Sequence, residues 1–282
     1  SAPIYTNPLA NVNPVFFKAT TPGEYTIDLH AASDLFGTQD NTLHMTILKV
    51  DIEQAETNVC MAMNNVMLNL TSDSYWAPAG TGGVTWTSTP AGLSVIGSTD
   101  NTFTFDPSRS TPATYVVTTS STLLPSCLDT CTVRVIKVEY AIDHVCTTAV
   151  HTTTHVVPVT LTPNPPGAAI DLELKHISGA GAAIFTDNTA STITITSSTN
   201  VTILGTQASD GISNMVMEAR LGPSVCTAKV FTVVDVDRER GTEVLHANNT
   251  VSDTTQADET NTVYICQTSN DTASLSLDLS WL

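Results

Sequence analysis

Basic residues are scarce in this sequence. Lys and Arg number only 10 against 27 Asp and Glu in 282 residues, a formal net charge of −17. So acidic a chain cannot neutralise a phosphate backbone, and an anionic membrane surface repels it, so we expect no nucleic-acid partner. Long apolar runs are also missing. None approaches the roughly 18 residues that a spanning helix needs, so we expect no membrane insertion.

Amphipathic helical patterns are missing as well. Apolar residues instead alternate with Ser and Thr at a period of two, in residues 114–119, 191–196 and 274–281. This alternation is typical of strands with one solvent-exposed face, and the β-branched residues that dominate it favour strands. With recurrent Pro and Gly turn signals between the strands, the sequence predicts an all-β chain.

Catalytic motifs are missing too. There is no G-x-S-x-G turn and no Gly-rich phosphate loop. His151 and His155 share one face of a strand, but their spacing of about 13 Å is too wide for one metal ion. We therefore expect neither an enzyme nor a cofactor.

Three similar segments divide the chain: residues 48–51, 136–139 and, more loosely, 233–236. We interpret each as the last strand of one domain running into the next. Their spacings of about 88 and 97 residues suit immunoglobulin-like β-sandwiches. The predicted complete domains are residues 51–139 and 140–236. Residues 1–50 and 237–282 remain, together about as long as one domain.

These two end segments match the two halves of the first complete domain. When the end of the chain is written directly before its beginning, Trp281, Ser1 and Pro3 have the same spacing as Trp86, Ser88 and Pro90 of the first complete domain. The aromatic positions then follow within a few residues, as Phe16, Phe17 and Tyr25. The sequence therefore predicts one sandwich split between the chain ends, with residues 237–282 as its first half and 1–50 as its second.

The strand at residues 84–88, followed by the Thr-Pro-Ala-Thr-Tyr segment at 111–115, resembles tandem bacterial immunoglobulin-like domains of the Big type. Such domains occur in adhesins, invasin-type stalks and other large surface proteins. The resemblance implies a scaffold without catalytic residues. The second complete domain departs from it, because Leu172 or Leu174 stands near the Trp position and the Thr-Pro segment is missing.

Six cysteines in an acidic, Thr-rich β chain indicate an oxidised, extracellular protein. First and last strands of such sandwiches lie side by side, so we expect the bridges Cys60–Cys131 and Cys146–Cys226; the alternative is reduced, buried thiols. Two cysteines are left over. Either Cys127 pairs locally with Cys131, or it bridges to Cys266 of a neighbouring molecule.

Two weaker signals concern calcium and sugars. Asp235, Asp237 and Glu239 cluster at a predicted domain junction, as do Asp51 and Glu53, and clustered carboxylates can bind calcium between extracellular domains. Solvated edge charges that deter strand pairing are the commoner explanation. Glycosylation sequons occur at four positions: Asn69, Asn200, Asn248 and Asn270.

Two functions fit these observations. The first is a structural subunit of an extracellular fibre or surface stalk, whose split domain is completed head to tail by copies of itself. Two intact sandwiches separate the halves, so we expect completion between molecules, with Trp281 packing against Pro3, Phe16, Phe17 and Tyr25 of the next one. Alternatively, the 282 residues are one period of a longer covalent chain. The second function is a ligand-binding adhesin segment, marked by exposed aromatics such as Tyr5, Tyr75 and Trp76.

Overall fold

The structure is a computed structural model, and it divides the chain into two units, residues 1–135 and 136–282. The border lies four residues before the predicted one at 139/140, because one long strand runs through it. The predicted borders at 50/51 and 236/237 stay predictions. The residues that the structure describes are 4–5, 17–18, 20–33, 37–147, 154–186, 190–206 and 212–235.

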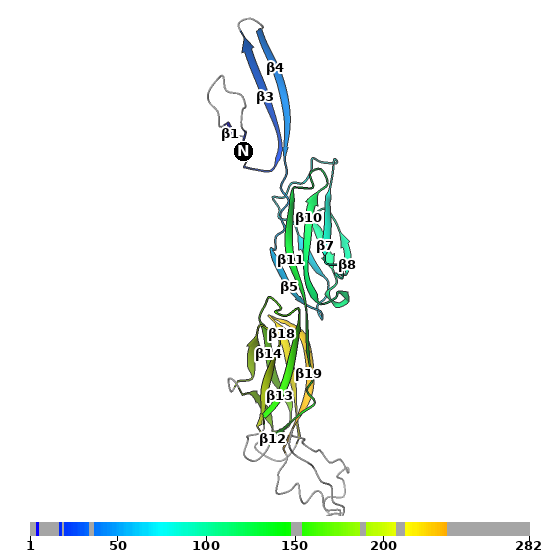
Figure 1. Cartoon of the computed structure of the whole chain (residues 1–282), viewed down its shortest axis with the longest axis vertical. Helices are drawn as coiled ribbons and strands as arrows, with labels where there is room; N and C mark the ends of the chain where they lie inside the picture. Colours follow the sequence, from blue (N-terminus) through cyan, green and yellow to red (C-terminus); the bar gives the residue numbers. More distant parts are fainter. Residues whose placement is uncertain are drawn as a thin grey trace, which may run out of the picture. The chain divides into compact units, whose positions relative to one another are not determined.

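The first unit contains a sandwich of two sheets (Figure 1). One sheet has the order β7–β10–β11–β5 and the other β6–β9–β8. The strands are β5 (Glu56–Cys60), β6 (Val66–Asn69), β7 (Val84–Thr89), β8 (Val95–Ser98), β9 (Thr102–Phe105), β10 (Ala113–Ser121) and β11 (Leu128–Tyr140). A 3₁₀ turn (Pro107–Arg109) joins β9 to β10. The sheet β6–β9–β8 thus faces the sheet that contains β7, β10 and β11, which is the immunoglobulin-like arrangement. The first strand of the sandwich, β5, pairs with the last, β11.

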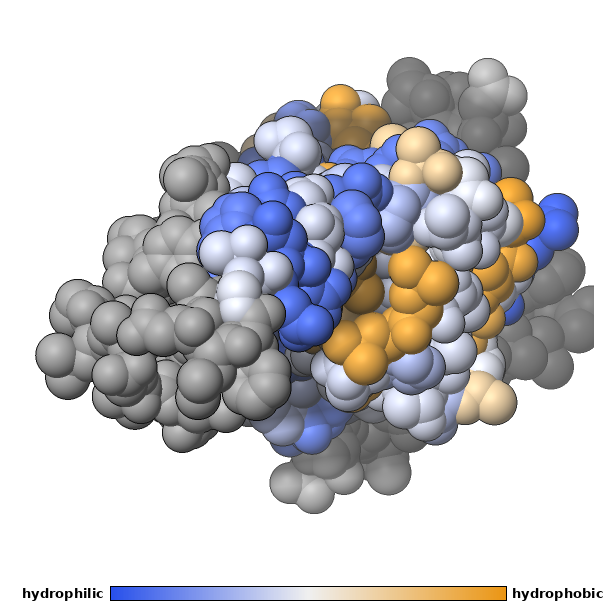
Figure 2. All heavy atoms as spheres, turned by 90° about the horizontal axis from the view of Figure 1, so that it is seen from above, coloured by the Kyte–Doolittle hydropathy of each residue, from blue (hydrophilic) through white to orange (hydrophobic). Residues whose placement is uncertain are grey.

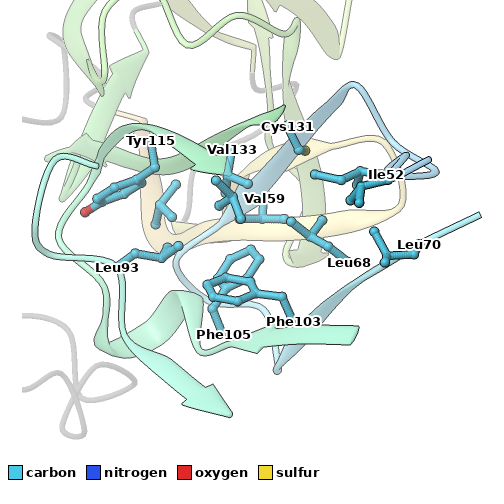
Figure 3. Packing of buried hydrophobic residues seen from close by; sticks show 13 residues of the cluster. Ile52, Val59, Leu68, Leu70, Leu93, Phe103, Phe105, Tyr115, Cys131 and Val133 are labelled. Carbon is cyan, nitrogen blue, oxygen red and sulfur yellow. The ribbon is translucent and has the colours of Figure 1, made fainter. Parts of the chain in front are cut away.

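Alternating residues of both sheets build the core of this sandwich (Figure 3). In β10, Tyr115 and Val117 are fully buried, whereas the intervening Val116 is exposed. Phe103 and Phe105 of β9 face them from the other sheet, and their rings lie 6.3 Å apart. The strand predicted at residues 114–119 is therefore confirmed, and its period of two arises because one face packs in the core.

The second unit is a sandwich of the same kind. One sheet has the order β12–β19–β18–β14–β16, and the other joins β15–β17–β13 to residues 137–140 of β11. Its strands are β12 (His144–Thr147), β13 (Thr154–Thr162), β14 (Ile170–Ser178), β15 (Ala182–Phe185), β16 (Thr192–Ile195), β17 (Thr199–Thr206), β18 (Ile212–Leu221) and β19 (Ser224–Asp235). Leu172 and Leu174 are buried in β14, which pairs with β18 as the Trp86 strand β7 pairs with β10. The all-β, tandem immunoglobulin-like prediction is confirmed.

Two small sheets precede these sandwiches. Strand β1 (Ile4–Tyr5) pairs with β2 (Phe17–Lys18), and β3 (Gly23–Ser33) pairs with β4 (Gly37–Ile47) along their full length. Within the described residues, β3 and β4 form a two-stranded sheet with no further strand. Such a ribbon is marginally stable by itself in water. It therefore differs from both sandwiches in lacking a partner sheet among the described residues.

Candidate functional site

The β3–β4 hairpin carries the same tyrosine corner as the β10–β11 hairpin. The Tyr25 hydroxyl donates a hydrogen bond to the carbonyl oxygen of Thr21 at 2.5 Å. The Tyr115 hydroxyl does the same to Thr111, also at 2.5 Å. This bond marks the start of the sixth strand of an immunoglobulin-like domain. The hairpin therefore has the same hydrogen bond as the last two strands of the complete sandwich.

The strand registers of the two hairpins correspond residue by residue. Tyr25 lies opposite Met45 as Tyr115 lies opposite Val133. Two residues further on, Ile27 lies opposite Leu43 as Val117 lies opposite Cys131. Alternation then places an apolar row on one face of β3 and a polar row on the other. The apolar row contains Tyr25, Ile27 and Leu29, and the polar row contains Thr26, Asp28 and His30.

Burial of the apolar face differs sharply between the hairpins. In the complete sandwich, Val117, Thr119 and Cys131 have no exposed surface. At the matching positions of the β3–β4 hairpin, Ile27 is also buried, but Leu29 is 40% exposed and Leu43 is 45% exposed. Both leucines are among the exposed large apolar side chains of the described residues. Figure 2 colours one face of the molecule by hydropathy and shows apolar side chains at several places on it. The apolar face of the hairpin is therefore only partly covered.

Among the described residues, the outer edge of the hairpin also has no counterpart of the strand that pairs with β10. Strand β7 pairs with β10 over six residues and places Trp86 opposite Thr119. The Trp86 ring stacks on Phe103 at 5.6 Å, and its indole N–H donates to the Thr99 carbonyl at 2.9 Å. Among the described residues, β3 pairs with β4 alone. Its free edge exposes backbone donors and acceptors that can pair with another strand.

The base of the hairpin is tied to the sandwich of the first unit through Tyr75. Its backbone N–H and carbonyl exchange hydrogen bonds with Lys49, at 2.7 and 2.8 Å, and its hydroxyl donates to the Glu24 carboxylate at 3.0 Å. The Lys49 ammonium pairs with Asp73 at 2.6 Å, and this hydrogen bond raises the pKa of Lys49. Trp76 packs against the core of the sandwich. Two of the three aromatics proposed as adhesin markers, Tyr75 and Trp76, thus have structural roles. The side chain of the third, Tyr5, lies outside the described residues.

The predicted disulfide pairs are wrong. Cys127 and Cys131 are free thiols, so Cys131 bridges neither to Cys60 nor to Cys127. Cys60, Cys146 and Cys226 are each disulfide-bonded. Cys146 and Cys226 do not bond to each other, because Cys146 lies opposite Val234, and Cys226 lies about 26 Å further along that strand. A disulfide needs Cα atoms within about 7 Å. Cys266 lies outside the described residues.

The physical reason for this error is strand direction. The first and last strands of these sandwiches do lie side by side, as expected. In the second unit β12 and β19 run parallel, so a cysteine early in β19 cannot reach one that pairs with the end of β19. In the first unit the Cys131 thiol is free and lies 3.9 Å from the Thr57 hydroxyl oxygen. The sequence predicted which strands are neighbours, but it did not predict how far along its strand each cysteine lies.

We expect alkylation to distinguish these thiols. In denaturant without reductant, a maleimide should modify Cys127 and Cys131 and leave Cys60, Cys146 and Cys226 unmodified. In the native protein Cys131 should react more slowly than Cys127, because Cys131 is buried. Burial also raises the pKa of the Cys131 thiol, so the thiol stays protonated and less reactive. Peptide mass mapping measures the outcome. Modification of Cys60, or protection of Cys131 in denaturant, would contradict the structure.

The calcium and sugar candidates are only partly covered by the described residues. Of the proposed carboxylates, Asp237 and Glu239 lie outside them, and Asp51 pairs with Lys49 at 3.0 Å. Only the backbone of Asp235 is described, at the end of β19. In the described part of the chain, no three His, Cys, Asp or Glu side chains group into a metal site. Asn200 is exposed and Asn69 half-buried, whereas Asn248 and Asn270 fall outside; all four sequons stay predictions.

The structure brings together one pair of histidines that the sequence did not predict. His144 of β12 and His155 of β13 bring their ring centroids within 6.4 Å. Burial, with a smaller contribution from His144, lowers the pKa of His155. His151, the residue expected to share a strand face with His155, lies outside the described residues. The pair was missed because strands that meet in space bring together residues that sequence spacing keeps apart.

Comparisons with known proteins give matches among solved structures. A structure of FdeC, an Escherichia coli adhesin, matches at 14% identity and a TM-score of 0.36, covering 84% of this chain and 85% of its own. The D00–D0 domain of intimin matches at 13% identity and a TM-score of 0.31, covering 68% of this chain and 100% of its own. The Yersinia pseudotuberculosis adhesin InvE matches at 14% identity and a TM-score of 0.27, covering 66% and 58%.

No protein-family model matches the chain, and the search of curated proteins found no match. In the described part of the chain, no helix has the length and apolar character needed to cross a membrane.

Proposed function

We propose that this chain is a structural subunit of an extracellular fibre or surface stalk. Neighbouring copies assemble head to tail by completing a split immunoglobulin-like domain. The observation that carries this proposal is the β3–β4 hairpin, which has the tyrosine corner and register of a complete sandwich but leaves Leu29 and Leu43 exposed. The remaining half comes from residues 237–282, whose end repeats the Trp86 strand motif.

Physical chemistry favours assembly of such halves. An open strand edge and a partly exposed apolar face are stabilised by an added strand, which satisfies backbone donors and removes apolar surface from water. The hairpin and the tail are different surfaces, so the contact is heterologous. A heterologous contact that does not close into a ring gives a filament.

Two further observations support this proposal. Disulfide-bonded cysteines are typical of proteins outside the reducing cytosol, which agrees with an extracellular fibre. The adhesin alternative loses support, since Tyr75 is used to hold the hairpin and Trp76 to pack the core. The fibre is therefore the better-supported function.

Electron microscopy of the purified 282-residue protein tests the proposal. We expect filaments, and a sedimentation coefficient that rises with protein concentration. A variant lacking residues 1–25 should form none, because it loses the tyrosine corner and the start of β3. It should keep the cooperative thermal transition of the two sandwiches, whose described cores lie outside the deleted residues. A monomeric intact protein, or unchanged filaments from the deletion variant, would overturn the proposal.

A further inference from the structure

The β10–β7 pairing of the first sandwich supplies a template for the strand that the hairpin lacks. We propose that the edge of β3 without a partner among the described residues receives residues 277–282 of a second copy as an antiparallel strand, with Trp281 opposite Leu29. This inference rests on the proposed head-to-tail assembly and adds to it the identity of the strand and its register. It follows from three observations: the template pairing, the alternation of the tail, and the exposed surface of the hairpin.

The template fixes the register. In the sandwich, β10 and β7 are antiparallel, with Thr119 opposite Trp86 and Ser120 opposite Thr85. The two tyrosine corners align Tyr25 with Tyr115, so Leu29 takes the place of Thr119 and His30 that of Ser120. The tail-to-head match aligns Trp281 with Trp86. Leu29 then faces Trp281, and His30 faces Ser280.

The C-terminal segment, residues 274–282, has the alternation of apolar and polar residues that a strand at this edge requires. Up to Trp281, its apolar residues occupy every second place and share a face with Trp281, namely Leu275, Leu277 and Leu279. The other face holds Ser274, Ser276, Asp278 and Ser280, and the last residue, Leu282. A strand with one apolar and one polar face suits an edge whose own faces are divided in the same way.

The exposed surface of the hairpin accepts a large apolar side chain. Leu29 and Leu43, at 40% and 45% exposed, lie on the face toward which Trp281 is directed in this register. Trp86 covers the equivalent place in the complete sandwich, where Thr119 has no exposed surface. Burial of apolar area stabilises by about 25 cal/mol per Å², so covering Leu29 favours the contact.

The polar side chains on the outward face of the β10–β7 pair support the same register. In the sandwich, the outward hydroxyls of Thr85 and Ser120 lie 2.9 Å apart, and Ser280 and His30 take their places in the proposed pairing. A slip of one residue turns every side chain to the opposite face. Trp281 would then stand on the polar side, opposite Asp28 or His30. The apolar and polar rows therefore exclude slips of one residue, and the template pairing of Trp86 with Thr119 selects the register among the others.

Disulfide cross-linking between single-site variants tests this register. One variant carries His30→Cys and the other Ser280→Cys, both in the full chain. Mixed in equal amounts under mild oxidation, they should form a 30–280 disulfide that peptide mass mapping identifies. Because each chain has one of the two new thiols, this bond can form only between molecules. Opposed residues of adjacent strands lie within the Cα distance that a disulfide needs.

The matched control replaces Ser280→Cys by Leu279→Cys, whose side chain lies on the other face of the strand. We expect it to cross-link to residue 30 about tenfold more slowly or worse. Filaments without the 30–280 bond, or equal rates for both pairs, would overturn the register while the assembly stands. A bond formed only within a His30→Cys/Ser280→Cys double variant would show that the chain's own tail fills the edge. Absence of filaments would overturn the assembly, and this inference with it.

Discussion

Replacing Leu29→Asp is expected to stop filament formation while both sandwiches stay folded. Leu29 lies on the apolar face of the hairpin and is still 40% exposed, so the isolated molecule tolerates a carboxylate there. Assembly in the proposed register would bury this charge against Trp281 without a partner. An unpaired buried charge costs several kcal/mol, and about 3 kcal/mol corresponds to a more than 100-fold weaker association. Sedimentation across a concentration series measures this loss.

The matched control is Thr26→Asp. It adds the same charge to the same strand, but on the exposed polar face opposite His44. We expect filaments with nearly unchanged concentration dependence, since exposed charge pairs contribute little. If the two variants assemble equally well, the apolar face of β3 is not part of the contact between molecules.

Phe103→Ala is expected to have the largest effect on the stability of the first unit. Phe103 is 1% exposed, stacks on Trp86 at 5.6 Å and lies 6.3 Å from Phe105. Its truncation removes a large side chain from a close-packed core and leaves a cavity, which costs about 3–5 kcal/mol. This is a large share of the roughly 5–15 kcal/mol that stabilises a domain. Urea unfolding should show a lower midpoint for this unit.

Val95→Ala serves as the comparison for this prediction. Val95 lies in β8 of the same sheet but is 47% exposed. We expect its replacement to change the free energy of unfolding by about 0.5 kcal/mol or less, as for most surface positions. Similar losses in both variants would mean that the sheet containing Phe103 does not pack as the structure shows.

Local patterns were enough to predict the class of fold. The alternation at residues 114–119 and 191–196 predicted β10 and β16, because a strand with one face in a core must alternate. The Thr-Pro segment before Tyr115 predicted the start of a strand, and the same spacing before Tyr25 predicted its counterpart. Both tyrosines then form the same hydrogen bond four residues back. These features depend on neighbours in sequence, so sequence alone determines them.

The candidate site was predictable only in part. The spacing of the repeated segments predicted that residues 1–50 are half of a domain. The hairpin has the tyrosine-corner hydrogen bond and the strand register expected of such a half. The exposure of Leu29 and Leu43 could not be predicted, because burial depends on which strands lie across the sheet. The role of Tyr75 was also missed, because it is set by a partner far away in sequence, the Glu24 carboxylate.

Sequence by itself determined the all-β class, the tandem sandwiches and the match between the chain ends, because periodicity and repeats are properties of the chain. Only the tertiary structure decided which cysteines are bonded. The first and last strands were expected to be neighbours and are, yet parallel pairing sets Cys146 opposite Val234 and far from Cys226. Strand direction and register arise from the packing of the whole sandwich, and a disulfide needs atoms to meet within a few ångströms. The same dependence on packing brought His144 and His155 together.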